Sequence, residues 1–190
     1  MTPGKCLLPW IRRSARWRAL SRPTSNSLTI RSENMKLSAH FALRALTQSD
    51  TARARGIENK PPLRLMKNLK HLARKLDAVQ TLLHHPLAIS SGFRSPVLNS
   101  EVGGSRASHH TLGFAADFTC RKFGSPLQVC RRIACSTIPF DQLIYEFGNR
   151  PDGGWIHISF ARCARRRVMT ICIGRQGYRR GLSRCPRLTN

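Results

Sequence analysis

The chain has 190 residues, which is enough for one domain of ordinary size with a buried core. Apolar residues make up 41% of it, which excludes a wholly disordered chain. No apolar run approaches the roughly 18 residues of a membrane-spanning helix. The net charge of +24 indicates an anionic partner, such as nucleic acid, a membrane surface or a cell-wall polymer. The seven cysteines contain no CxxC pair, so neither a closed disulfide framework nor a zinc finger is indicated.

The positive charge is concentrated at the two ends of the chain. Residues 1–34 carry seven Lys or Arg and one acid, and residues 161–190 carry nine Arg and no acid. We predict a disordered basic extension over 1–34, a domain over 35–182 and a basic tail over 183–190. Ordered pattern begins at Met35, which favours translation from there. The apolar stretch at 6–11 is too short for a signal peptide.

The predicted helices lie mainly in the first half of the domain. Ser38 is predicted to cap a short helix with Phe41, Leu43 and Leu46 on its apolar face, and residues 47–60 are predicted to be a loop. The two prolines at 61–62 open the best helix in the chain. Its apolar residues are spaced four and three apart, which is typical of a helix packed on a core. These residues are Leu65, Leu69, Leu72, Leu76, Val79 and Leu83.

The rest of the domain is predicted to be mostly strands. Two further helices begin where a capping Ser precedes Pro, at Ser95 and Ser125. The predicted strands are 87–90, 114–119, 140–147, 155–160 and 168–173. Their short connections favour antiparallel pairing. We therefore predict an α+β fold, with helices packed on a small, mostly antiparallel sheet.

Two histidines and one aspartate are predicted to converge. In the strand WIHIS, His157 lies on the face opposite the isoleucines, and in the predicted strand 114–119 Asp117 lies on the face opposite the phenylalanines. His110 lies on the approach to that strand, and His109 is the alternative to it. Two imidazoles and one carboxylate leave a fourth position open, which is typical of catalytic zinc.

Three parts of the chain stand out: SGFRSPVLN, VGGSRASHHTLGFAAD, and FDQLIYEFG followed by WIHIS. They resemble the M15 family of zinc D-Ala-D-Ala carboxypeptidases, and within it the M15A branch of bacterial and phage cell-wall peptidases. The resemblance covers about residues 37–182. It implies a Hedgehog/D-Ala-D-Ala-peptidase-like fold and one zinc ion bound by His110, Asp117 and His157.

The general base does not follow the family pattern. Some members of the wider family place Glu three residues before the last zinc-binding His, where this chain has Gly154. The nearest substitute is Glu146 in the neighbouring strand, and Asp152 is the weaker alternative. The family's Arg corresponds to Arg94, which would pair with a substrate carboxylate. Ser108 is predicted to contact substrate as well.

The function that we predict is zinc-dependent hydrolysis of peptide bonds in peptidoglycan stem peptides, by a carboxypeptidase or an endopeptidase. No specific nucleic acid is expected. Without a clear signal peptide, the protein would be cytoplasmic at synthesis and reach the wall through phage lysis, a virion or another export route. Two alternatives stay open: a non-catalytic cell-wall-binding or phage structural module of the same fold, and a basic nucleic-acid-binding protein. Cys130 and Cys135 are interpreted as structural rather than metal-binding.

Overall fold

The computed structural model describes residues 34–186. The predicted extension over 1–34 therefore lies almost wholly outside the described residues, as does the end of the predicted tail. The described elements, in chain order, are η1 (Leu43–Leu46), α2 (Asp50–Arg55), η2 (Leu63–Leu65), α3 (Met66–Leu83), β1 (Ala88–Ser91), α4 (Pro96–Glu101), β2 (Ala115–Thr119), α5 (Pro126–Ala134), β3 (Gln142–Glu146), β4 (Trp155–Ser159), β5 (Arg167–Ile171) and β6 (Arg179–Arg180).

The long helix α3 forms where its apolar spacing predicts. Five residues of the predicted stripe are buried, from Leu69 to Leu83, and Ala73 joins them. Leu65 belongs to the 3-10 turn η2 before the helix and is only partly buried. The two prolines therefore precede a 3-10 turn, and the α-helix itself begins at Met66.

The segment from Ser38 to Lys60 differs from its prediction in two ways. The first short helix, η1, begins at Leu43 and has no side-chain cap, so Ser38 does not start it. The predicted loop over 47–60 contains the helix α2. The Ser49 side chain accepts a hydrogen bond from the Ala52 amide at 3.2 Å, which caps this helix. A one-and-a-half-turn helix has too short an apolar stripe to be recognised by periodicity, and its cap was the available signal.

The two Ser-Pro caps are confirmed. Ser95 accepts a hydrogen bond from the Leu98 amide and begins α4, which ends before Val102. Ser125 begins α5, where Gln128 completes a reciprocal capping box. In both helices proline occupies the first turn, where its missing amide hydrogen costs no hydrogen bond.

The strands form one six-stranded sheet in the order β1-β2-β4-β3-β5-β6. Every neighbouring pair is antiparallel except β3 and β5, which run parallel. The sheet confirms the predicted α+β fold with a mostly antiparallel sheet. β2 and β3 flank β4, so that Asp117 and Ile144 are both direct partners of His157.

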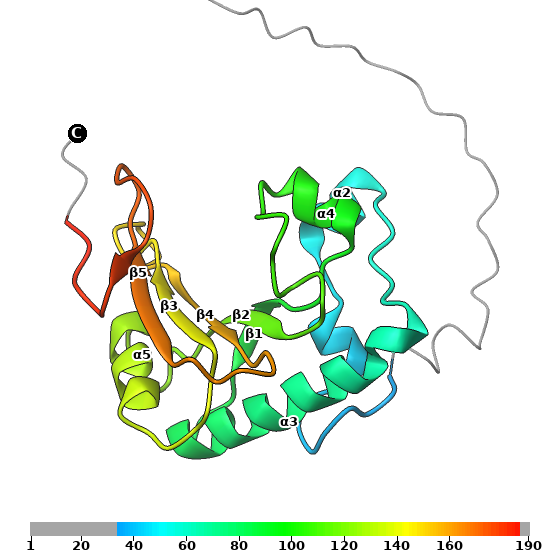
Figure 1. Cartoon of the computed structure of the whole chain (residues 1–190), viewed down its shortest axis with the longest axis horizontal. Helices are drawn as coiled ribbons and strands as arrows, with labels where there is room; N and C mark the ends of the chain where they lie inside the picture. The colour runs from blue at the N-terminus through cyan, green and yellow to red at the C-terminus, as the bar shows by residue number, and fades with distance from the viewer. Residues whose placement is uncertain (1–33, 187–190) are drawn as a thin grey trace, which may run out of the picture.

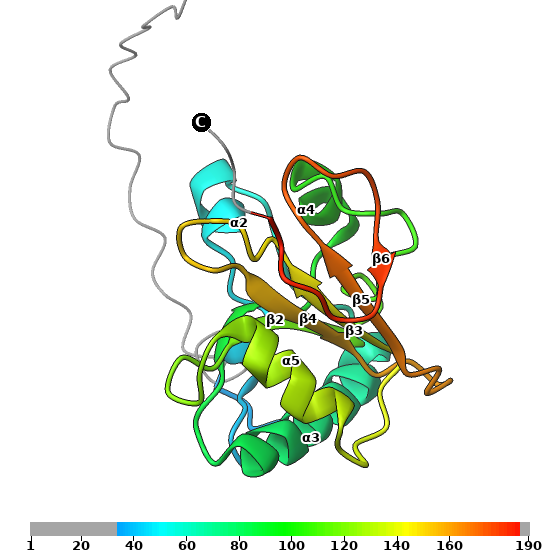
Figure 2. The ribbon, with the colours of Figure 1, turned by 90° about the vertical axis from the view of Figure 1, so that its left-hand side faces the viewer.

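The two faces of the sheet have different coverings. α3 and α5 pack on one face, which we call the core face; Figure 2 shows α5 in front of the sheet and α3 below it. We call the other the metal face. In Figure 1 this face looks toward α2 and α4, which stand on the opposite side of the molecule from β5. Within the part of the chain that the structure describes, every helix is too short or too polar to cross a bilayer.

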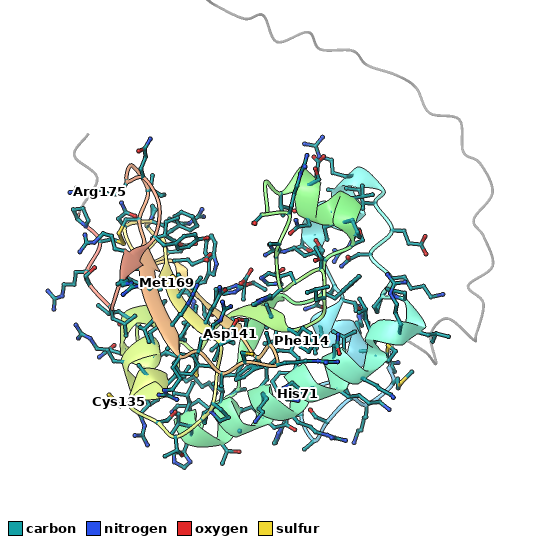
Figure 3. All side chains as sticks on the ribbon, in the orientation of Figure 1. His71, Phe114, Cys135, Asp141, Met169 and Arg175 are labelled. Atoms are coloured by element: carbon teal, nitrogen blue, oxygen red, sulfur yellow. A yellow bond between two sulfur atoms is a disulfide. The ribbon has the colours of Figure 1, made fainter. Side chains whose placement is uncertain are left out.

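The cysteines have mixed roles. Cys172 and Cys185 form a disulfide, which the odd cysteine count did not predict. Cys130 is buried in the core, as expected for a structural residue, whereas Cys135 is exposed at the end of α5, where Figure 3 labels it. The disulfide closes a short loop after β5 rather than a framework around the core.

Candidate metal centre

His110, Asp117 and His157 are brought together on the metal face, as the sequence predicts. The Asp117 Oδ1 atom lies 2.8 Å from His157 Nδ1 and 3.1 Å from His110 Nε2. The two nitrogens are 3.1 Å apart, and all three residues are buried. Ligand atoms around tetrahedral zinc lie about 3.3 Å apart, because each bond to the metal is about 2.0–2.1 Å long. The three atoms are thus close enough to bind one ion.

The His110 ring is held in the tautomer that a metal ligand needs. Its Nδ1 lies 2.6 Å from the carbonyl oxygen of Gly92. A carbonyl only accepts, so Nδ1 carries the hydrogen and Nε2 presents its lone pair to Asp117 and His157. A side chain at Gly92 would collide with the backbone of Leu46, so this carbonyl reaches the ring only because the residue is glycine.

Asp117 uses its two oxygens differently. Oδ1 faces the two histidines, and Oδ2 accepts a hydrogen bond from the Arg94 guanidinium at 2.5 Å. Burial acts to raise the pKa of Asp117, but His110 and His157 outweigh it and hold that pKa well below its ordinary value. The carboxylate is therefore ionised, which is the form that binds a cation.

Arg94 lies beside the metal group and binds one of its members. Its Nε donates to Ser91 Oγ at 2.8 Å, while Nη2 donates to Asp117. The guanidinium is mostly buried, with 18% of the side chain exposed. Ser91 was not among the predicted site residues, although it belongs to the same SGFRS motif. The expected pairing of Arg94 with a substrate carboxylate stays a prediction.

Glu146 extends from the same face of the sheet as His157. In the register Glu146 is opposite Trp155, and Ile144 is opposite His157. Burial raises the pKa of Glu146 above its ordinary value, His157 opposes this rise, and Asp117 adds to it. The register makes Glu146 and His157 diagonal neighbours on one face of the sheet. A half-buried carboxylate with a raised pKa is suited to accept and return a proton.

The backbone at Gly154 leaves no room for the glutamate that some members of the wider family are expected to have there. Gly154 has a positive φ of 72°, and a Cβ at this position would collide with the carbonyl of Glu146 and with the Phe147 backbone. Any side chain is therefore excluded. Asp152, in the same loop, is exposed and binds Arg150 Nε and the Gly154 amide, each at 3.1 Å. These bonds hold the pKa of Asp152 below its ordinary value.

His109 is directed away from the metal group. Its Nδ1 lies 3.0 Å from Ser159 Oγ and 3.5 Å from the carboxylate of Asp141. Asp141, labelled near the middle of Figure 3, is fully buried and is held by two hydrogen bonds from Arg165. Burial lowers the pKa of His109, although Asp141 acts in the opposite direction. The structure thus groups His110, and not His109, with Asp117.

Ser108 lies in the turn that leads into the metal group. Its hydroxyl accepts a hydrogen bond from the His110 amide at 3.3 Å, and its carbonyl accepts one from Thr111 Oγ1 at 2.7 Å. Both contacts shape the turn that presents His110. A contact between Ser108 and substrate stays a prediction.

Two of the cavities next to the sheet are large enough or close enough to the site to matter for a ligand. One of about 280 Å³ adjoins Arg94 and Ser91 and extends toward α2 and α4. Another, of about 850 Å³, is lined by Tyr145, the first turn of α5 and the loop at 148–151. Tyr145 belongs to the core face, so the larger cavity lies away from the metal group. The smaller cavity is the one beside the site.

A comparison with known families agrees with this geometry. A sequence profile of the family described as Peptidase M15 matches residues 39–159. The chain belongs to the peptidase M15 family. The matched span of this M15 peptidase contains all three residues of the metal group and Glu146. No match was found among curated proteins. Family and geometry together support a metallopeptidase.

Proposed function

We propose that this M15 peptidase is a zinc enzyme that hydrolyses peptide bonds in peptidoglycan stem peptides. The proposal rests on one observation. The ligand atoms of His110, Asp117 and His157 lie close enough together to bind a single ion, and Glu146 is on the same face of the sheet. Two imidazole nitrogens and one carboxylate oxygen form a donor set that zinc favours in catalytic sites. Bound there, zinc would polarise the scissile carbonyl and make water more acidic.

In this proposal Glu146 is the general base and then the general acid. It takes a proton from the attacking water, whose oxygen bonds to the carbonyl carbon. It then gives that proton to the leaving nitrogen as the C–N bond breaks, so that a carboxylic acid and an amine are formed. The raised pKa of Glu146 supports both transfers, because its protonated and ionised forms are closer in free energy near neutral pH.

Arg94 acts in this proposal on Asp117 and on the substrate. One nitrogen holds Oδ2 of Asp117, which keeps Oδ1 turned toward the two histidines. The remaining guanidinium hydrogens are available to a substrate C-terminal carboxylate in the adjoining cavity. This role favours a D-Ala-D-Ala carboxypeptidase of the M15A branch, and Ser108 would contact the same substrate. An internal endopeptidase cut is the other form of the proposal.

The cell wall suits the remaining features of the chain. The net charge of +24 favours approach to an anionic polymer. The disulfide between Cys172 and Cys185 is of a kind that persists in oxidising surroundings outside the cytoplasm. Both features are compatible with release by phage lysis, delivery in a virion or another route of export.

The test is hydrolysis of purified peptidoglycan fragments by the full chain, followed by mass analysis of the products. We expect loss of one terminal D-Ala from pentapeptide stems, or a cut cross-link if the enzyme is an endopeptidase. A chelator should stop the reaction and added zinc should restore it. A zinc-loaded protein that leaves every fragment intact while the Asp117→Ala variant binds no zinc would refute the peptidase and keep the metal site.

A further inference from the structure

The larger cavity, of about 850 Å³, is bounded by three segments that lie far apart in the chain. The start of α5 forms one side, the loop 148–151 between β3 and β4 forms the second, and residues 184–185 form the third. Figure 2 looks onto this side of the molecule, with α5 in front of the sheet and the returning end of the chain in red. The cavity is as large as the sites that bind organic ligands in other proteins.

Two of the three sides are fixed to the chain that follows β5. Cys185 is joined by the disulfide to Cys172, directly after that strand. Asn149 binds the next residue, Ile173, twice: its side-chain nitrogen donates to the carbonyl and its side-chain oxygen accepts from the amide, each at 3.0 Å. The loop and the third side are therefore held in place relative to each other.

Each side of the cavity contributes one exposed arginine: Arg131 from α5, Arg150 from the loop and Arg184 from the third side. No lining residue that the structure describes is acidic. The Nε atom of Arg150 binds Asp152, outside the cavity. Within residues 34–186, Arg131 and Arg184 form no ion pair. The cavity is therefore positively charged and favours an anion.

The hydroxyl of Tyr145 reaches the cavity from the sheet. Only 6% of the residue is exposed, yet it lines the cavity together with Gly148. A Cβ at Gly148 would collide with the hydroxyl oxygen, so the hydroxyl lies directly under the loop. Among the described residues this hydroxyl has no hydrogen-bond partner. A buried donor without a partner is costly, so an acceptor bound in the cavity would be stabilised by it.

We propose that this cavity is a second binding site, which holds phosphate groups of an anionic polyol-phosphate polymer of the cell wall. The inference goes beyond the proposed peptidase and does not depend on its chemistry. A phosphate presents oxygens in several directions, so guanidinium groups from three sides can each bind it, whereas a planar carboxylate has only two oxygens. The hydroxyl of Tyr145 donates to the same anion.

The size and lining of the cavity favour a polyol-phosphate polymer over the other sources of phosphate. The volume is much larger than a single phosphate needs, so neighbouring units of a polymer can fill the rest. Nucleic acid has the same phosphate chemistry. However, Tyr145 is the one aromatic residue among the described residues of the lining, and its ring is buried, so bases have no platform on which to stack. A polymer bound here would hold the enzyme on the wall and leave the metal face open to peptide.

Calorimetry of the full chain with a poly(glycerol phosphate) oligomer, at physiological salt, tests the proposal. The double variant with Arg131→Gln and Arg184→Gln loses two of the three guanidinium groups and should bind the oligomer about 10–100-fold more weakly. Tyr145→Phe removes one oxygen atom and should weaken binding by a smaller factor, about 3–10-fold. Its melting temperature should not fall, because the hydroxyl has no partner to lose among the described residues.

The matched control is the double variant with Arg132→Gln and Arg175→Gln. It also removes one exposed arginine from α5 and one from the chain after β5, and neither lines the cavity. Its affinity for the oligomer should stay within about twofold of the parent.

Equal weakening in the two double variants would overturn the site, because the polymer would then bind to the basic surface at large. Inorganic phosphate that binds as tightly as the oligomer would overturn the polymer as the ligand. So would duplex DNA with the same number of phosphates, if it bound more tightly through Arg131 and Arg184. Binding is measured without turnover, so a parent protein that binds the oligomer but cleaves no peptide would refute the peptidase alone.

Discussion

The two faces of the sheet are built from alternate residues of the same strands and have opposite tasks. On β2 and β4, Phe118 and Ile156 lie in the core, whereas Asp117 and His157 lie on the metal face. The core face is covered by α3 and α5, and its side chains are nearly all apolar. The metal face carries buried polar groups that bind one another. Stability and chemistry therefore depend on neighbouring residues, and single substitutions should separate them.

The largest expected effect comes from removing a residue of the metal group. In Asp117→Ala or His157→Ala, two donors remain, so bound zinc and peptide hydrolysis should both fall to background. Metal analysis of the purified protein and product formation measure this. His109→Ala removes the adjacent imidazole and should keep its zinc. Retention of zinc in Asp117→Ala, or loss of zinc in His109→Ala, would contradict the assignment of the metal ligands.

Glu146→Gln should lower kcat by about 10²–10⁴-fold, because a positioned base is lost while the metal donors remain. Zinc content should be unchanged. The base works when ionised, so the parent's activity should be full above the pKa of Glu146 and decline as pH falls through it. Because burial raises that pKa, the decline should begin at a higher pH than an ordinary Glu would give.

Asp152→Asn is the matched control for the base, since Asp152 is exposed and bound within its loop. This variant should keep the kcat of the parent and the same decline of activity at low pH, which we call the acid limb of the pH profile. If Asp152→Asn lost the limb and Glu146→Gln kept it, the base would be Asp152.

On the core face, Phe118→Ala should lower the free energy of unfolding by about 3–5 kcal/mol, because it leaves a cavity among packed side chains. Phe118 is fully buried. Urea unfolding of the metal-free protein measures the change. Glu146→Gln, on the metal face, should change this free energy much less, because burial disfavours the charge of Glu146 and the amide has the same size. An equal loss of unfolding free energy in the two variants would contradict the assignment of stability to the core face and chemistry to the metal face.

The smallest effect is expected at Arg94, which holds a member of the metal group rather than the metal. Arg94→Ala should weaken zinc binding about 10–100-fold, as is common for groups that orient metal ligands. Competition with a chromophoric chelator measures the affinity. If Arg94 acts on substrate alone, zinc affinity will be unchanged and KM will rise for peptides with a free C-terminal carboxylate but not for their amides.

Strong local signals in the sequence predicted much of this fold. The stripe of α3 and the caps at Ser95 and Ser125 are confirmed because each depends on residues within a few positions of one another. The helix α2 was missed because its apolar face is too short to show a period. The disulfide was missed because pairing Cys172 with Cys185 depends on the return of the chain through β6.

The sequence by itself determined which residues form the metal group and on which face of a strand they lie, because residue type and the two-residue alternation along a strand are local properties. It did not determine what surrounds that group. Tertiary structure decided that Arg94 binds Asp117 and that a side chain at Gly154 would collide with the backbone of Glu146. These relations arise from the order and register of the strands, which bring residues distant in the chain within reach of one another.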